Sequence, residues 1–254
     1  MITPDLIFAF LTLTFLEIIL GIDNIIFISI LASRFPEVDR KKLMRVGLFL
    51  AMLMRILLLM GINWLVQMQS SLFSFSWGWL SSEVSIQSLI LLAGGLFLLY
   101  KSTREIYEKV EDFSQTEPGL GPNKITFSRA LLQIVLIDIV FSFDSILTAV
   151  GMTNGIPFAL PIMVAAVVVA ILIMMLFAAP VSHYINTHPS LQILGLSFLL
   201  LIGFMLITEA AHLSQTTIFG SSIGVIPKGY LYFAIAFSLG VEMINMRFRK
   251  GNKA

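Results

Sequence analysis

The chain has 254 residues, of which 57% are apolar and only 12% carry a charge. Because about a quarter of the residues of a soluble domain are charged, this composition predicts a membrane protein that crosses the bilayer several times. The 16 Lys and Arg nearly cancel the 15 Asp and Glu, which excludes a basic surface for nucleic acid, and the absence of Cys excludes disulfides, thiolate metal sites and cysteine nucleophiles.

Seven apolar stretches are long enough to span a membrane, since a transmembrane helix needs about 20 apolar residues. In chain order they cover roughly 6–33, 44–66, 84–102, 130–151, 158–181, 191–212 and 229–246. We interpret the longest connection, 103–129, as a cytoplasmic loop made of a charged, solvated helix end followed by a Pro/Gly turn. The pattern predicts an all-α membrane protein whose seven transmembrane helices form a single domain, 1–254.

The distribution of basic residues predicts how these spans are oriented. Fourteen of the sixteen Lys and Arg fall on one side of the seven-span arrangement, while Lys228 lies on the other side and Arg55 lies inside the second span. Lys and Arg collect in cytoplasmic loops. We therefore expect the N-terminus outside the cell and the C-terminus in the cytoplasm.

The first and fourth spans contain the same pattern without a gap. EIILGIDNII occupies 17–26 and DIVFSFDSIL occupies 138–147. Each begins with an acid, followed by three apolar residues, a small residue and another apolar residue. The seventh position is Asp in both, the eighth is Asn in the first motif and Ser in the second, and the last two are apolar. The following two spans also correspond, and a unit of three spans must enter the membrane in opposite directions in its two copies. This predicts two inverted three-helix repeats, about 6–102 and 130–212, and an extra C-terminal helix at about 229–246.

The motifs place four carboxylates near the middle of the membrane. A charged carboxylate there costs about 2.5–3.5 kcal/mol on insertion scales, and Arg55 is the only base away from the ends of the spans. A bound cation or bound protons must therefore balance the remaining charge. The candidate ligands all offer oxygen atoms, which favours Mg²⁺, Ca²⁺ or Mn²⁺ over copper or zinc. They are Glu17, Asp23, Asn24, Asp138, Asp144 and Ser145.

The two acids of each motif are six residues apart, which leaves them ~120° apart around an ideal helix. Either the helix is broken near Gly21 and Ser142, which would expose backbone carbonyls as ligands, or each acid faces a different neighbour. We favour a local break. For any one of these acids taken alone, a protonated structural group and a functional group are equally good explanations. Matched pairs of acids in two repeats favour a functional site.

Three further charged residues in the spans have open roles. Arg55 matches Asp23 in depth, so it is either the counter-ion of Asp23 or a side chain that extends to the membrane surface. Glu209 lies near the end of its span, and Glu242 has no partner in the other repeat.

These motifs resemble the TerC family of bacterial integral membrane proteins, also called the tellurite-resistance C or Alx family. The resemblance covers nearly the whole chain and rests on EIILGIDNIIFISIL, QIVLIDIVFSFDSILTAVGM, LILLAGGLFLLYKSTREI and IPKGYLYFAIAFSLGVE. It implies a seven-span fold of the LysE-like exporter group in the bacterial cytoplasmic (inner) membrane. It also implies manganese export that depends on Glu17, Asp23, Asp138 and Asp144, with Asn24 and Ser145 beside them.

The leading hypothesis is a secondary exporter of a divalent cation, with Mn²⁺ favoured and Ca²⁺ as the other candidate. We expect no catalytic residues, no permanently bound cofactor and no nucleic-acid partner; the bilayer and the cation are the expected partners, and protons are a further candidate. The oligomeric state is open. One alternative is a metal-handling accessory protein of secretion that does not transport. Another is an intramembrane aspartyl protease, which is disfavoured because Gly21, Ile22 and Asp23 lack the second Gly of the GxGD signature.

Overall fold

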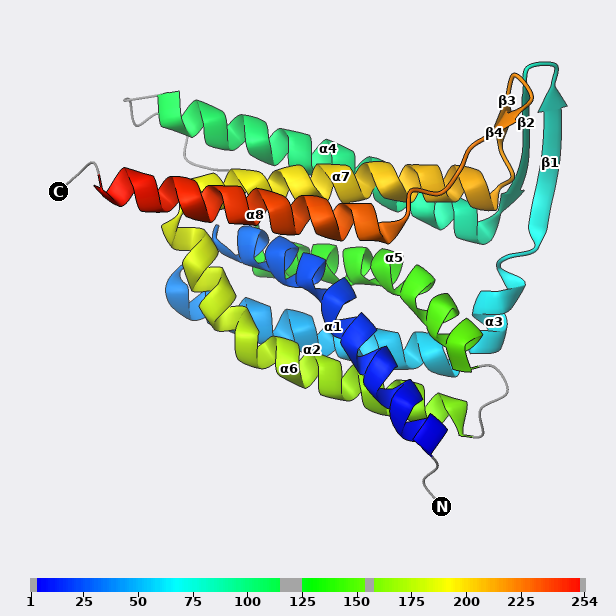
Figure 1. The fold of residues 1–254 in the computed structure, drawn as a ribbon, viewed down its shortest axis with the longest axis horizontal. Helices are drawn as coiled ribbons and strands as arrows, with labels where there is room; N and C mark the ends of the chain where they lie inside the picture. The colour runs from blue at the N-terminus through cyan, green and yellow to red at the C-terminus, as the bar shows by residue number, and fades with distance from the viewer. Residues whose placement is uncertain (1–3, 115–124, 154–157, 252–254) are drawn as a thin grey trace. The chain divides into compact units, whose positions relative to one another are not determined.

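The computed structural model describes residues 4–114, 125–153 and 158–251. Within them lie eight helices and four short strands (Figure 1). In chain order the elements are α1 (Pro4–Ala32), α2 (Glu37–Met60), α3 (Ile62–Gln67), β1 (Ser71–Trp77), β2 (Leu80–Ser85), α4 (Ile86–Ser114), α5 (Phe127–Thr153), α6 (Ala159–Thr187), α7 (Pro189–Leu213), β3 (Thr217–Ile218), β4 (Ser221–Ser222) and α8 (Lys228–Gly251).

All of the described helices except α3 are long and apolar enough to cross a membrane. The all-α membrane class and the seven spans are therefore confirmed. The inverted repeats, the single domain and the repeat boundaries stay predictions. The solvated helix end expected within 103–129 is part of α4, which continues to Ser114, and the Pro/Gly turn that should follow it lies outside the described residues. Pairs one turn apart stabilise this charged end: Lys101 binds Glu105 at 2.7 Å and Arg104 binds Glu108 at 2.9 Å.

The favoured break in the motif helices is wrong. α1 is continuous from Pro4 to Ala32 and α5 from Phe127 to Thr153. Inside a bilayer, a broken helix leaves backbone groups without hydrogen bonds at a cost of several kcal/mol, which a continuous helix avoids. Gly21 has a packing role instead, because a Cβ at this position would overlap the Sδ atom of Met174 on α6.

The chain divides into two compact units. The first consists of 1–70 and 120–184 and contains α1, α2, α3, α5 and most of α6. In this unit α5 packs against both α1 and α2, and α1 packs against α2. The core between these helices contains the fully buried side chains of Leu31, Leu59, Ile134 and Phe143.

The second unit consists of 71–119 and 185–254 and is built on the contact between α4 and α7. Gly95 and Gly203 bring the two helix backbones together. A Cβ on Gly95 would lie 2.7 Å from the carbonyl oxygen of Gly203, and a Cβ on Gly203 would lie 3.0 Å from the carbonyl oxygen of Gly95. Such small residues allow membrane helices to pack closely.

The second unit also carries a four-stranded antiparallel sheet in the order β1-β2-β3-β4, which the sequence analysis did not predict. β1 and β2 form a hairpin that turns at Gly78 and Trp79, and the positive φ of Gly78 (51°) suits such a turn. The turn between β3 and β4 packs against it, with the rings of Trp79 and Phe219 5.8 Å apart.

Candidate functional site

The first motif forms one buried polar stripe on α1. Glu17, Gly21 and Asn24 are spaced four and three residues apart, and seven residues at 100° each return to within about 20° of the starting direction. Glu17 is 8% exposed and Asn24 is 5% exposed. Because α1 packs against α2 and α5 in this unit, the stripe faces protein rather than lipid.

The second motif forms a matching stripe on α5. Asp138, Ser142 and Ser145 have the same spacing and are all buried. The Ser142 hydroxyl donates to Oδ2 of Asp138 at 3.3 Å, and the Ser145 hydroxyl donates to the backbone carbonyl of Ser142 at 3.2 Å. The two motifs therefore place an acid and two smaller residues at corresponding positions of their helices.

A hydrogen bond connects the two stripes. The Asn24 amide donates from Nδ2 to Oδ1 of Asp138 at 2.7 Å, although the residues are 114 positions apart in the chain. The structure thus brings together Glu17, Asn24 and Asp138, which the sequence analysis assigned to one site. Ser145 lies in the same stripe, but its hydroxyl binds its own helix backbone.

Arg55 of α2 joins the two acids. Its Nη2 atom lies 2.7 Å from Oδ1 of Asp138, and its Nε atom lies 3.2 and 3.3 Å from Oδ1 and Oδ2. Its Nη1 atom forms an ion pair with Oε1 of Glu17. The side chain is only 2% exposed, so the alternative in which it extends to the membrane surface is wrong. Its described partners are Glu17 and Asp138, and the sequence analysis missed this double role.

The described site carries more acid than base. Glu17 and Asp138 contribute two carboxylates, and Arg55 contributes one guanidinium. The hydroxyl of Thr14, three residues before Glu17, is buried and has no hydrogen-bond partner among the described residues. Leaving a buried polar group unpaired costs about 1–3 kcal/mol. The site therefore offers oxygen atoms, and two carboxyl groups against one guanidinium, to a cationic guest.

Two predicted ligands lie outside the described side chains. Asp23 belongs to α1 and Asp144 belongs to α5, but only their backbone positions are described. Among the side chains that the structure does describe, no group of three or more His, Cys, Asp or Glu is arranged to hold a metal ion. The participation of Asp23 and Asp144 in a common site stays a prediction.

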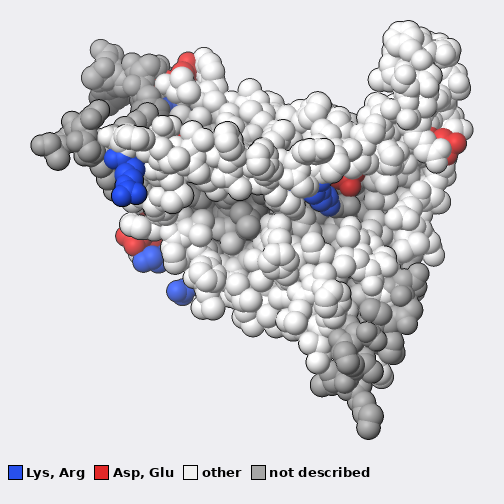
Figure 2. All heavy atoms as spheres, in the orientation of Figure 1, with Lys and Arg blue, Asp and Glu red and all other residues white. Residues whose placement is uncertain are grey.

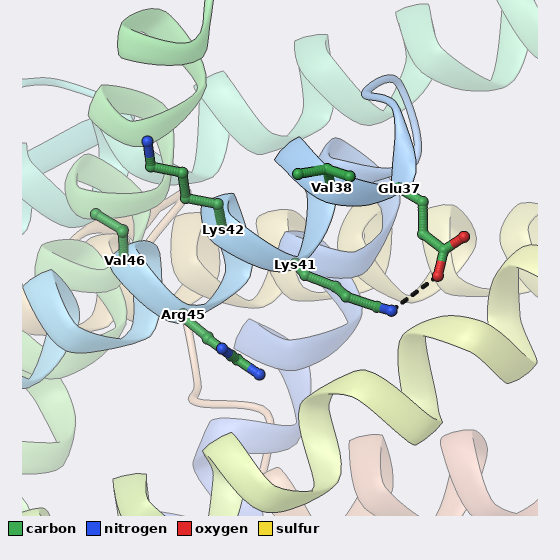
Figure 3. Close-up of a pocket in the computed structure, with 6 residues that line it drawn as sticks. All are labelled: Glu37, Val38, Lys41, Lys42, Arg45 and Val46. Carbon is green, nitrogen blue, oxygen red and sulfur yellow. Dashed lines mark ion pairs between the residues drawn. The ribbon is translucent and has the colours of Figure 1, made fainter.

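A separate cleft of about 560 Å³ lies at the beginning of α2. It is lined by Glu37, Val38, Lys41, Lys42, Arg45 and Val46. Figure 3 shows Lys41 reaching toward Glu37, with which it forms an ion pair at 2.8 Å, while the side chains of Lys42 and Arg45 extend in other directions. The excess of basic side chains makes this cleft unsuitable for a cation, but it agrees with the charge bias expected of a cytoplasmic helix end.

The other two acids of the spans are in the second unit. Glu209 on α7 is half-buried, and Glu242 on α8 has a buried Oε1 atom without a hydrogen-bond partner among the described residues. Neither is brought to a second carboxylate by the described contacts, and their roles stay open.

The sequence of the whole chain, residues 2–254, matches the model of the family described as "Integral membrane protein TerC family". The chain belongs to the TerC family. This TerC-family chain is 44% identical over 247 residues to a UPF0053 protein of Haemophilus influenzae, with 97% of the chain and 96% of the relative covered. It is 43% identical to the UPF0053 inner membrane protein YgdQ of Escherichia coli K12, with 98% of the chain and 96% of the relative covered.

A longer relative shares the same region. The TerC-family chain is 42% identical over 247 residues to the UPF0053 inner membrane protein YoaE of E. coli K12, and the match covers 97% of the chain but 44% of that relative. No solved structure matches the fold significantly.

Proposed function

We propose that this TerC-family protein is a secondary transporter that exports a divalent metal cation, with Mn²⁺ as the favoured substrate and Ca²⁺ as the second candidate. One observation carries the proposal. Two buried carboxylates from different helices, Glu17 and Asp138, meet at the single guanidinium of Arg55. A purely structural ion pair needs one acid for one base, whereas this arrangement has an acid to spare.

The chemistry of the stripes fits a hard cation. The carboxylates of Glu17 and Asp138, the side-chain carbonyl oxygen of Asn24 and the unpaired hydroxyl of Thr14 are all oxygen donors of the kind that Mn²⁺ and Ca²⁺ accept. Asp23 and Asp144 would raise the number of carboxylates in the two motifs to four. Burial strengthens the attraction, because charges in a low-dielectric interior interact more strongly than in water.

Arg55 acts in this proposal as a tethered cation. While the site is empty, its guanidinium neutralises one carboxylate and orients both. An arriving divalent cation competes with Arg55 for the same oxygen atoms, and Arg55 returns to them when the cation leaves. The buried acids therefore never face the membrane interior without positive charge beside them, which would cost several kcal/mol for each acid. Protons on the same acids remain a second candidate for coupling.

The proposed location is the cytoplasmic (inner) membrane of a bacterium. Two of the compared relatives are named inner membrane proteins. With fourteen of sixteen Lys and Arg on one side of the spans, the N-terminus lies outside and the C-terminus in the cytoplasm. Transport in the export direction then starts from the basic side of the protein.

Flux through reconstituted vesicles tests this function. The purified protein is placed in liposomes that contain a metal-sensing dye, and Mn²⁺, Ca²⁺, Mg²⁺ or Zn²⁺ is added with and without a pH gradient. We expect Mn²⁺ flux for the unmodified protein and for Glu108→Gln, which alters the ion pair with Arg104 at the charged end of α4, and no flux for Asp138→Asn. Metal binding without any flux would instead support an accessory protein that does not transport.

A further inference from the structure

The β1–β2 hairpin has one apolar and one polar face. Residues directly opposite each other in an antiparallel pair share a face of the sheet. On one face Phe73 lies opposite Val84, Phe75 opposite Ser82, and Trp77 opposite Leu80; on the other face Ser74 lies opposite Glu83, and Ser76 opposite Ser81. Every residue of β1 is exposed, and Trp77 is 76% exposed. Three large aromatic rings thus stand together on one side, without a described partner that covers them.

The apolar face is directed toward the helices of its own unit. Ser82 and Val84 belong to this face, and they line a cavity of about 170 Å³ together with Leu89 of α4 and Ala210 of α7. The three aromatic residues of β1 lie on the same face, opposite residues of β2, but farther from the helices. The three rings therefore face the space beside the ends of α4 and α7, on the same side of the hairpin as the helices.

That space lies where the apolar span of α4 begins. β2 ends at Ser85, and α4 begins its membrane span at the next residue, Ile86. Figure 1 shows β1 and β2 running across the direction of α4 and α7 at the end where α4 begins. Leu89 and Leu96, on the first three turns of this span, are exposed. The aromatic face of the hairpin is thus continuous with an exposed apolar surface of the span.

We propose that the β1–β2 hairpin lies on the bilayer with the rings of Phe73, Phe75 and Trp77 in the lipid headgroup region. Aromatic rings, Trp above all, are enriched at this depth, and the paired residues of the apolar face include no charge. In Figure 2 the projecting outer part of the hairpin is drawn without charged residues. The serine face, with Glu83, remains in water. By the charge distribution of the chain, this is the outer leaflet.

Fluorescence of a single tryptophan tests the proposal. The chain has three Trp, so Trp64→Phe with Trp79→Phe leaves Trp77 alone. The full chain is reconstituted in phosphatidylcholine vesicles with or without lipids brominated near the headgroup. We expect blue-shifted Trp77 emission, a clear loss of emission with brominated lipid, and little loss with aqueous iodide.

The adjacent polar face supplies a matched control. In the same background, Trp77→Phe with Ser76→Trp moves the indole by one residue to the opposite face of β1. We expect this variant to respond in the opposite way, with strong quenching by iodide and little by brominated lipid. Emission of Trp77 that iodide quenches and brominated lipid does not would overturn the proposal. Emission that neither quencher reaches would show that protein covers the face, and would also overturn it.

A second measurement does not depend on tryptophan. The chain has no Cys, so single substitutions Phe75→Cys and Ser74→Cys place one thiol on each face of β1. We expect a water-soluble maleimide to label Ser74→Cys quickly and Phe75→Cys much more slowly in vesicles, and both at similar rates in denaturant. Equal labelling rates in vesicles would contradict the proposed contact with lipid.

Discussion

The Arg55 guanidinium on α2 binds both oxygen atoms of the Asp138 carboxylate on α5, with its closest contact at 2.7 Å. Both residues are 2% exposed, and they are 83 positions apart in the sequence. The same guanidinium also forms an ion pair with Glu17 on α1. One buried base therefore connects three membrane helices through two acids. We expect the stability of the first unit to depend strongly on this base.

Replacing Arg55 by Met should strongly destabilise the protein. Glu17 and Asp138 would remain buried without their common cation, and breaking a buried pair in this way costs about 3–5 kcal/mol. Thermal unfolding in detergent measures the effect. Arg45→Met, on the exposed basic end of the same helix, is the control and should change little. The double variant Arg55→Met with Asp138→Asn should recover part of the loss, and strictly additive effects would contradict direct coupling.

Asn24 should control the affinity of the site through Asp138. Asn24→Leu removes the amide that donates to Oδ1 of Asp138, and we expect a loss of about 1–3 kcal/mol in stability. Asn24→Asp replaces that donor with another acid, so it should be destabilising without metal but should gain more thermal stability from added Mn²⁺ than the unmodified protein gains. Unchanged Mn²⁺ stabilisation in Asn24→Asp would argue that the cation does not reach this stripe.

The contact between α4 and α7 should not tolerate a methyl group. Gly95→Ala would place Cβ 2.7 Å from the Gly203 carbonyl oxygen, and we expect this overpacking to cost about 1–3 kcal/mol in the free energy of unfolding. Gly240→Ala is the control, because a Cβ there meets nothing within 4 Å and should stabilise α8 by about 0.5–1 kcal/mol. If both variants melt at the same temperature in detergent, the close approach of the helices is wrong.

The orientation can be tested with single cysteines. Ser74→Cys lies in β1, and Val110→Cys lies in the charged end of α4; both positions are exposed. In spheroplasts, whose cytoplasmic membrane is intact, a membrane-impermeant maleimide should label Ser74→Cys. It should label Val110→Cys only after the spheroplasts are lysed. The reverse pattern would place the basic side of the chain outside.

The sequence predicted the spans well, because they depend on a local signal: a long apolar run must cross the membrane as a helix. The spacing of Glu17 and Asn24, seven residues, also places them on one face, but only the spacing of the two acids was considered. Asp138 contacts Asn24 and shares Arg55 with Glu17, and the binding of a metal by these residues stays a prediction. The break expected near Gly21 is wrong, because in a bilayer the need to satisfy backbone hydrogen bonds outweighs the tendency of Gly to break a helix.

Two features of the structure, the partners of Arg55 and the β1–β2 hairpin, were not predicted from the sequence. The depth of Arg55 in its span suggested Asp23 as a partner, but depth does not say which face of α2 meets α1 and α5. The hairpin had a visible signal, since Phe73, Phe75 and Trp77 alternate with serines before Gly78. This period of two is typical of a strand with two different faces.

Equilibrium binding of Mn²⁺ tests the central claim, that the buried acids hold a cation, most directly. The electron paramagnetic resonance signal of free Mn²⁺ is followed while purified protein is added. We predict that the unmodified protein and Glu108→Gln lower the free signal equally, and that Glu17→Gln with Asp138→Asn leaves it unchanged while the protein stays folded. Equal binding by all three proteins, or by none, would contradict the account.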